Sequence, residues 1–108
     1  MKQFLNVSET MTEFGISEAS ARSLVRGVRD NIPERYHESD VVGHYKCSVR
    51  AVALMDFARY GNDLDTAPPY KPLELERELG IGQPAVNPHD LAVEVVRTVI
   101  SMVGGITV

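Results

Sequence analysis

Short polar side chains and arginines are concentrated in residues 17–29 of the sequence. Ser17 and Ser20 begin this stretch, and Arg22, Arg26 and Arg29 follow. Arginine binds phosphate or carboxylate oxygens through paired hydrogen bonds, and serine adds short polar contacts. The stretch therefore predicts an anion-binding surface. The alternative interpretation is a solvated helix face, because arginines paired with nearby carboxylates are common on protein surfaces and contribute little to stability.

A second set of side chains could bind a metal ion or act as a redox sensor. Asp40, His44 and Cys47 follow one another at four- and three-residue spacing, and His37 lies just upstream. On a helix this spacing would place the three side chains on one face. A metal site needs about four good ligands, and the sequence does not offer a clear fourth. A capping aspartate, a surface histidine and a small buried cysteine account for the same residues, so we predict no metal and no other cofactor.

Motifs of catalysis are absent from the sequence. It contains no Gly-x-Ser-x-Gly segment, no serine with a convincing general base, and no phosphate-binding or dinucleotide-binding glycine loop. The paired carboxylates at Asp63 and Asp65 are expected in a solvated loop. We predict that the protein is not an enzyme and has no catalytic residue.

Length and composition predict one compact, soluble, cytoplasmic domain. The chain has 108 residues with 44% hydrophobic side chains, which is enough for one core. Its single cysteine allows no internal disulfide, and we expect neither a signal peptide nor a membrane span. Residues 1–60 hold eight basic and eight acidic side chains, whereas residues 61–108 hold three and seven. A surface for nucleic acid is therefore expected in the first half, because phosphate binding needs local positive charge.

Two short helices are expected to position the arginines. Ser8 is predicted to cap the first helix, which has apolar residues at three- and four-residue spacing and Thr10 pointing outward. Gly15 is expected to end this helix in a left-handed conformation. Ser17 and the following Glu18 then begin the second helix. The inward positions of the second helix are expected to be Ala21, Leu24, and Val25 or Val28.

A wing and a long helix are predicted next. Residues 26–37 contain Gly27, Asp30, Asn31 and Pro33, which are too many breakers for a helix and predict a short hairpin or extended loop. Residues 39–60 show helical periodicity and predict one long helix, with a break considered near Cys47–Ser48.

The second half of the chain is predicted to be a proline-rich connector, residues 61–72, and a helical region, residues 73–108. Gly80 is expected to end a short helix, and Asn87–Pro88 to begin an apolar one. Residues 88–103 would form either the centre of the core or the seam of a homodimer. The oligomerisation residues of the dimer would be Leu91, Val95, Val96, Val99 and Met102.

The order of these elements resembles the winged helix-turn-helix domains of the MerR and excisionase type. The resemblance covers roughly residues 5–58 and includes the Gly-Ile-Ser turn at 15–17 and the segment RYHESDV at 35–41. In that group a wing strand containing an aromatic residue runs into an acidic helix start. The sequence is also similar to the DNA-binding domains of small terminase subunits from some tailed phages. The implied fold is mainly α: a helix-turn-helix with a short wing in residues 1–60, a long helix, the connector and the apolar helix.

The resemblance implies a small protein that binds duplex DNA, with the helix at 17–25 in the groove. Its role would be that of a regulator, an excision factor or a DNA-packaging recogniser of a phage or mobile element, acting as a homodimer. The implied DNA-binding residues are Ser17, Glu18, Ser20, Arg22, Arg26, Arg29, Arg35 and Lys46. The alternative is an adaptor or acidic inhibitor that docks on a basic protein and uses the helix pair only as a scaffold.

Overall fold

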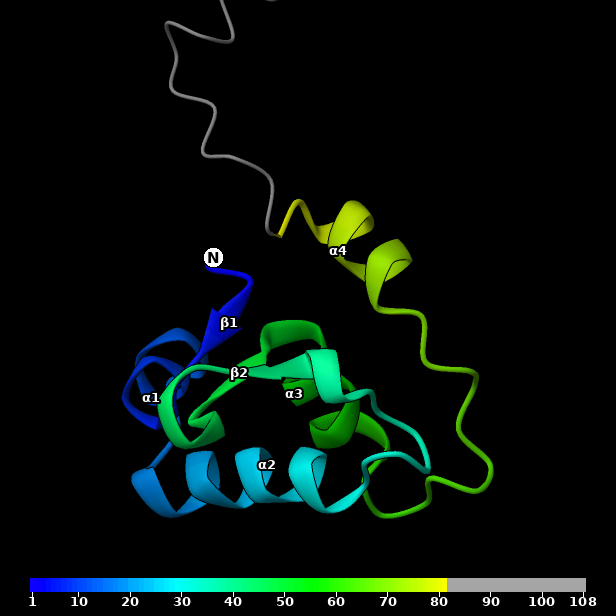
Figure 1. Cartoon of the computed structure of the whole chain (residues 1–108), viewed down its shortest axis with the longest axis horizontal. Coiled ribbons are helices and arrows are strands. Elements are labelled where there is room, and N and C mark those ends of the chain that lie inside the picture. Colours follow the sequence, from blue (N-terminus) through cyan, green and yellow to red (C-terminus); the bar gives the residue numbers. More distant parts are fainter. Residues whose placement is uncertain (82–108) are drawn as a thin grey trace, which may run out of the picture.

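The computed structural model of the chain describes residues 1–81, which form a mainly helical fold with one small sheet (Figure 1). The prediction of a mainly α fold is confirmed at this level. A single 3₁₀ turn lies at Glu38–Asp40, and the turn at His44–Lys46 includes two residues with positive φ, Tyr45 and Lys46. In chain order, the elements are β1 (Phe4–Leu5), α1 (Val7–Phe14), α2 (Glu18–Asp30), β2 (Val41–Val42), β3 (Ser48–Arg50), α3 (Ala51–Tyr60) and α4 (Pro72–Leu79).

Asn6, rather than Ser8, caps the first helix. The Asn6 side chain accepts a hydrogen bond from the Glu9 amide at 2.8 Å, and the Glu9 carboxylate accepts one from the Asn6 amide at 3.0 Å. This reciprocal pair satisfies two amides that the helix would leave free. The prediction that Thr10 points outward is also wrong. Thr10 is fully buried, and its hydroxyl donates to the Asn6 carbonyl oxygen at 2.7 Å.

The break between α1 and α2 lies at Gly15, as predicted. Gly15 has φ 63° and ψ 41°, a left-handed conformation that glycine adopts without a steric penalty. Ser17 then caps α2, and its hydroxyl accepts a hydrogen bond from the Ser20 amide at 3.2 Å. The buried side chains of α2 are Ala21, Val25 and Val28, and Leu24 on the same helix is half-buried.

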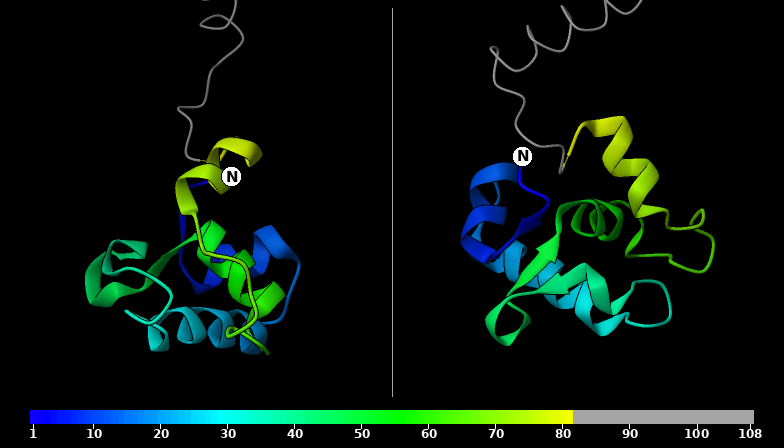
Figure 2. Two further views of the ribbon diagram at one scale, coloured as in Figure 1. Left: turned by 90° about the vertical axis from the view of Figure 1, so that its right-hand side faces the viewer. Right: turned by 45° about the horizontal axis from the view of Figure 1, so that its top comes forward.

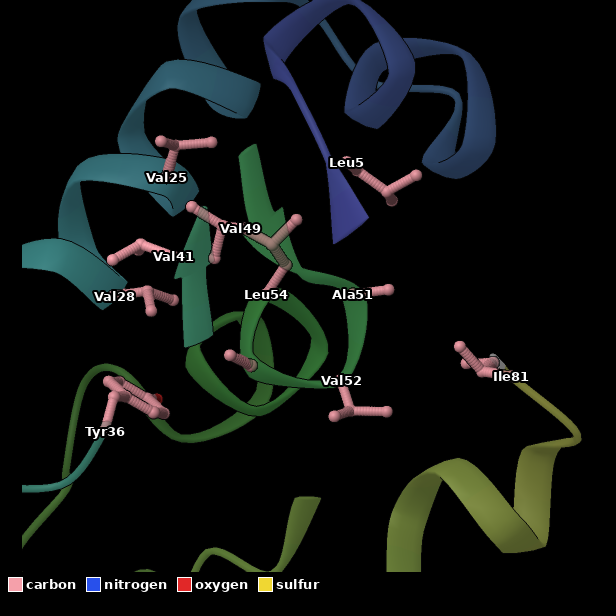
Figure 3. Close-up of a cluster of buried hydrophobic side chains, with 11 residues drawn as sticks. Leu5, Val25, Val28, Tyr36, Val41, Val49, Ala51, Val52, Leu54 and Ile81 are labelled. Carbon is pink, nitrogen blue, oxygen red and sulfur yellow. The ribbon is translucent and has the colours of Figure 1, made fainter. Parts of the chain in front are cut away.

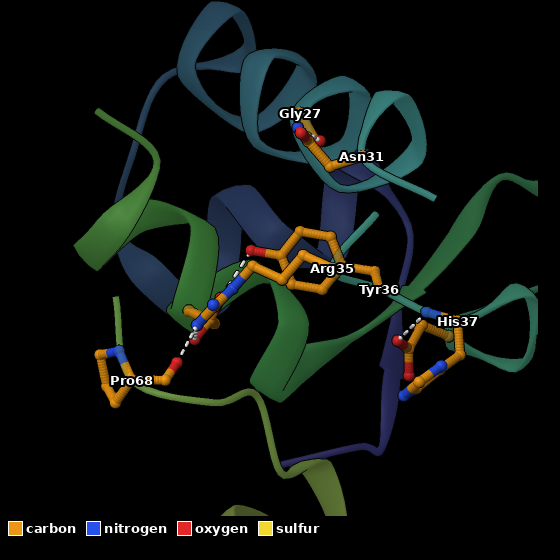
Figure 4. Close-up of polar contacts among 8 residues, drawn as sticks. Gly27, Asn31, Arg35, Tyr36, His37 and Pro68 are labelled. Atoms are coloured by element: carbon orange, nitrogen blue, oxygen red, sulfur yellow. Dashed lines mark hydrogen bonds and ion pairs between the residues drawn. The ribbon is translucent and has the colours of Figure 1, made fainter. Parts of the chain in front are cut away.

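The predicted wing at residues 26–37 is wrong, because α2 continues to Asp30. Gly27 lies inside the helix, and the Asn31 side chain donates to its carbonyl oxygen at 2.7 Å (Figure 4). Turns follow α2 up to Arg35, and no strand occurs between residues 26 and 37. The breakers therefore end the helix five residues later than its predicted end at residue 25.

The hairpin of the described chain is formed by β2 and β3, in the segment that was predicted to begin a long helix. β3 is the central strand and pairs antiparallel with both neighbours, with Leu5 and Val41 each opposite Val49. Gly43 has φ 89° and Tyr45 has φ 59°, conformations that no right-handed helix accommodates. Helix begins only at Ala51, so the prediction of a helix over residues 39–60 is wrong for its first half.

The core lies between α2, the sheet and α3 (Figures 1 and 3). In Figure 1, α2 runs below the sheet and α3, α1 lies at one end of α2, and α4 lies above. The largest fully buried side chain is Tyr36, on the segment that joins α2 to the sheet. The buried apolar cluster consists of Leu5, Val25, Val28, Tyr36, Val41, Val49, Ala51, Val52, Ala53, Leu54 and Ile81.

A segment without regular structure separates α3 from α4. Residues 61–71 contain no regular element, Pro72 occupies the first turn of α4, and Gly80 ends α4 with φ 69°. No helix within residues 1–81 combines the length and apolar character needed to cross a lipid bilayer. The apolar helix predicted at 88–103, with its oligomerisation residues Leu91, Val95, Val96, Val99 and Met102, lies outside the described residues.

Candidate functional site

The outer surface of α2 carries most of the residues that the sequence singled out. The helix buries one stripe of side chains and leaves the opposite side in solvent. The six sequence-predicted residues on or beside this helix are all exposed: Ser17, Glu18, Ser20, Arg22, Arg26 and Arg29. Ala19 and Ser23 are exposed on the same helix and were missed. Helical spacing could have indicated both residues, because side chains three and seven positions before Arg26 lie on the same face of the helix as Arg26.

Arg22 differs from the other two arginines of α2. Its guanidinium binds the Glu18 carboxylate, with Nε and Nη2 at 2.9 and 2.6 Å from the same oxygen. Both side chains are largely exposed, so the pair contributes little to stability. Within residues 1–81, no ion pair includes Arg26 or Arg29. Among the described residues, no carboxylate competes with an external anion for these two guanidinium groups.

The three arginines line one hollow beside α2. The hollow has a volume of about 340 Å³ and also includes Val7, Val25 and Asp30. Arginine's planar fork of donors matches the oxygens of a phosphate or carboxylate, and several such groups around one hollow raise the local positive potential. Asp30, which also lines the hollow, opposes this effect. Three positive charges against one negative charge make the hollow more favourable for an anion than for a cation.

The β2–β3 hairpin presents a second exposed surface. Its turn contains His44, Tyr45, Lys46 and Cys47, all exposed, and the Tyr45 side chain has 84% of its surface in solvent. The hairpin projects from the body beside α2, and β3 contacts that helix (Figures 1 and 2). Of these turn residues the sequence had selected only Lys46 as a binding residue. Gly43, after two adjacent valines, is the signal that could have indicated a strand and a turn.

Arg35 does not join this surface. Its Nε and Nη2 donate to the two Asp56 carboxylate oxygens, each at 2.7 Å, and Nη2 also donates to the Pro68 carbonyl oxygen at 2.9 Å (Figure 4). Asp56 is almost fully buried, and the same carboxylate accepts a hydrogen bond from the Tyr36 hydroxyl at 2.6 Å. The Arg35 guanidinium is thus engaged in an internal ion pair. It ties the segment after α2 to α3 and to the connector.

The internal bonds also change proton affinities. The hydrogen bonds to Asp56 raise the pKa of Arg35 above its usual value. Burial, followed by the hydrogen bond to Asp56, raises the pKa of the Tyr36 hydroxyl far above its usual range. Tyr36 therefore stays neutral in the folded protein, and this cluster is a structural element rather than a source of mobile protons.

Arg50 forms a second internal cluster at the end of β3. Its Nη1 lies 3.0 Å from a Glu76 oxygen, and its Nε lies 2.9 Å from Asp40 Oδ1 without hydrogen-bond geometry. Gln3 also donates to Glu76, at 3.3 Å. Arg50 thereby connects the hairpin base to α4. The Tyr70 hydroxyl lies buried nearby, and its pKa is raised by burial and by the negative charge of Asp40.

The structure does not bring Asp40, His44 and Cys47 onto one helix face. Asp40 is fully buried and accepts a hydrogen bond from the His37 amide at 2.9 Å, whereas His44 and Cys47 are exposed in the hairpin turn. In the described part of the chain, no group of three or more histidine, cysteine, aspartate or glutamate side chains is arranged to hold a metal ion. The interpretation as one helical stripe is wrong because this segment is a hairpin.

Comparisons of the chain with protein-family models, with curated proteins and with solved structures gave no match.

Proposed function

We propose that the protein binds duplex DNA as a winged helix-turn-helix domain, with α2 in the major groove and the β2–β3 hairpin as the wing. The observation that carries the proposal is the free outer face of α2, with Arg26 and Arg29 unpaired within residues 1–81, beside a projecting hairpin. A helix of this kind fits the major groove, and its arginines can bind phosphates or the edge of guanine.

The order of elements supports the same interpretation. A short strand precedes two helices separated by a tight turn, a hairpin follows the second helix, and the last strand lies between the other two. The turn at Gly15 and the cap at Ser17 fix where α2 begins. The proposed wing is residues 41–50, which replaces the wing that the sequence suggested at 26–37.

The exposed residues have distinct proposed roles. Arg26 and Arg29 bind phosphate oxygens, and Lys46 at the hairpin turn adds a further positive charge. Ser20 and Ser23 are short enough to let the helix approach base edges. Glu18 holds Arg22 in place through their ion pair, and its carboxylate can accept from a cytosine amino group. Arg35 is excluded because Asp56 binds it inside the fold.

The experiment is a salt titration of DNA binding, measured by fluorescence anisotropy on a mixed-sequence duplex. The test variant is Arg26→Ala/Arg29→Ala, and the matched control is Lys71→Ala/Arg77→Ala, which also removes two exposed positive charges but from the α4 region. The wild type should weaken steeply between about 50 and 200 mM salt. The test variant should bind at least about tenfold more weakly than the wild type. The slope of the logarithm of its binding constant against the logarithm of the salt concentration should be smaller by about two, one for each phosphate contact.

Equal losses in the two double variants would contradict the proposal, because they would indicate attraction to net charge without a defined surface. Undetectable binding of the wild type at low salt, to any duplex, would contradict it as well. That result would favour the alternative in which the helix pair is the scaffold of a protein-binding module.

A further inference from the structure

Two apolar hollows meet on the outer face of α3. The first, of about 390 Å³, lies between α3 and the α1–α2 pair and is lined mainly by Phe14, Ile16, Leu24 and Met55. The second, of about 280 Å³, lies between α3 and α4 and includes Tyr60, Leu75 and Leu79. Met55 and Arg59 line both hollows. We refer to the joined pair as the α3 groove.

The α3 groove leaves apolar side chains open to solvent. Phe14, Leu24, Met55 and Leu75 pack against the core but are only partly buried, and Leu79 has 57% of its surface exposed. Two hollows that share their boundary residues form one continuous apolar surface that includes residues of α1, α2, α3 and α4. Continuous exposed apolar surface of this kind usually marks a place where another segment or protein binds.

The same chain contains a segment of matching chemistry. Residues 91–103 include nine apolar side chains among thirteen, and the remaining four are Glu94, Arg97, Thr98 and Ser101. Exposing such a segment to water is unfavourable, and an apolar surface that covers it lowers the free energy. Its charges also match the groove, where Arg59 lies on the shared boundary and Glu78 lines the second hollow. Asp56 adds no free charge because Arg35 binds it.

The groove is within reach of this segment. The described chain ends at Ile81, which is buried in the core cluster together with residues of α3. The nine residues 82–90 can span up to about 30 Å, whereas α3, with ten residues, is only about 15 Å long. A tethered segment has an effective local concentration on the order of millimolar, which favours docking within one chain over docking between copies.

We infer that the α3 groove is the docking site of residues 91–103 of the same chain. The groove shares no lining residue with the arginine hollow of α2, so a docked segment leaves Arg22, Arg26 and Arg29 accessible. The inference therefore stands independently of the proposed binding of DNA. It places residues 91–103 against α3 of the same chain rather than in the interface of a dimer.

The test measures thiol accessibility in the full chain. In a Cys47→Ser background, Ala58→Cys places a thiol in the groove, and Ser23→Cys places a reference thiol on the exposed side of α2. A neutral maleimide should modify the groove thiol about tenfold or more slowly than the reference thiol, because reaction in the groove requires the docked segment to open. Adding Val96→Asp and Val99→Asp should restore rapid modification of the groove thiol without changing the reference rate.

The outcomes separate the possible occupants. Protection that does not depend on protein concentration, in a chain that elutes as a monomer, supports docking within one chain. Protection that appears only at high concentration, together with a dimeric elution volume, overturns the inference in favour of a second copy. Equal modification rates at the two positions also overturn it, because they show an open groove.

Discussion

The ring of Phe57 on α3 occupies the space that any side chain at Gly27 of α2 would fill. A Cβ atom built at Gly27 overlaps three carbon atoms of that ring. Glycine inside a helix is normally unfavourable, so its presence here is explained by the close approach of the two helices. This contact fixes the position of α2 on the body and therefore the direction of its exposed face.

Replacing Gly27 with alanine should destabilise the protein. Alanine at an interior helix position normally adds about 1 kcal/mol to the free energy of unfolding relative to glycine. Here the overlap with Phe57 should reverse the sign and cost about 1–3 kcal/mol. Urea unfolding measures the change, and Ser23→Ala on the exposed side of α2 is the control. Adding Phe57→Leu should recover part of the loss, whereas a more stable Gly27→Ala variant would show that the helices do not meet at this contact.

Local features of the fold could be predicted from the sequence, whereas features that depend on distant residues could not. The end of α1 at Gly15 and the cap at Ser17 were readable, because both depend on interactions within a few residues. Gly27 was interpreted as a breaker because its reason lies thirty positions away, at Phe57. Arg35 was assigned to the binding surface for the same reason, since its partner Asp56 is twenty-one residues distant.

The hairpin was missed for a different reason. Val42, Val49 and Val52 fall on a helical stripe by spacing alone, so one long helix accounted for the pattern. Strand formation at Val49 depends on pairing with Leu5, which is a neighbour in the sheet but lies near the beginning of the sequence. β-branched residues favour strands only where such pairing is available. Long-range pairing is not visible in local periodicity, and the position of the proposed wing therefore shifted to residues 41–50.

Removing the Asp56 carboxylate should be the most damaging single change in the polar interior. Asp56→Ala leaves the Arg35 guanidinium and the Tyr36 hydroxyl without their partner, and loss of one member of a buried ion pair costs about 3–5 kcal/mol. The control is Asp63→Ala, an exposed loop residue, with an expected change within about 0.5 kcal/mol. Equal urea midpoints for the two variants would contradict the role of this cluster.

Stability should fall at alkaline pH because of Tyr36 and Tyr70. Burial raises the pKa of both hydroxyls above the usual value. Folding therefore favours the protonated form of both tyrosines. Their contribution to the free energy of unfolding is fully present below about pH 10 and is lost as the pH rises further. Urea unfolding from neutral pH to about pH 11 should show this decline. Tyr36→Phe should reduce the slope of the free energy of unfolding against pH by about 1.4 kcal/mol per pH unit in this range. An unchanged slope would show that the Tyr36 hydroxyl does not cause the decline.

Replacing Lys46 with glycine should stabilise the fold but weaken DNA binding. Tyr45 and Lys46 have φ values of 59° and 54°, a left-handed region that costs a non-glycine residue about 1–2 kcal/mol. Lys46→Gly should relieve this strain and raise the free energy of unfolding, but weaken DNA binding because the charge is lost. Lys46→Ala is the matched control, which removes the charge and keeps the strain. Comparable affinity of wild type and both variants would exclude the hairpin turn from the interface.

Amide chemical-shift mapping of the full chain during titration with a short duplex shows directly which surface binds DNA. We expect the perturbed amides to cluster on the exposed side of α2, residues 19–29, and at the hairpin turn, residues 43–47. The amides of α4 should stay unchanged. Perturbations centred on α3 or α4, with α2 and the hairpin unaffected, would show that DNA does not bind at α2 and the hairpin.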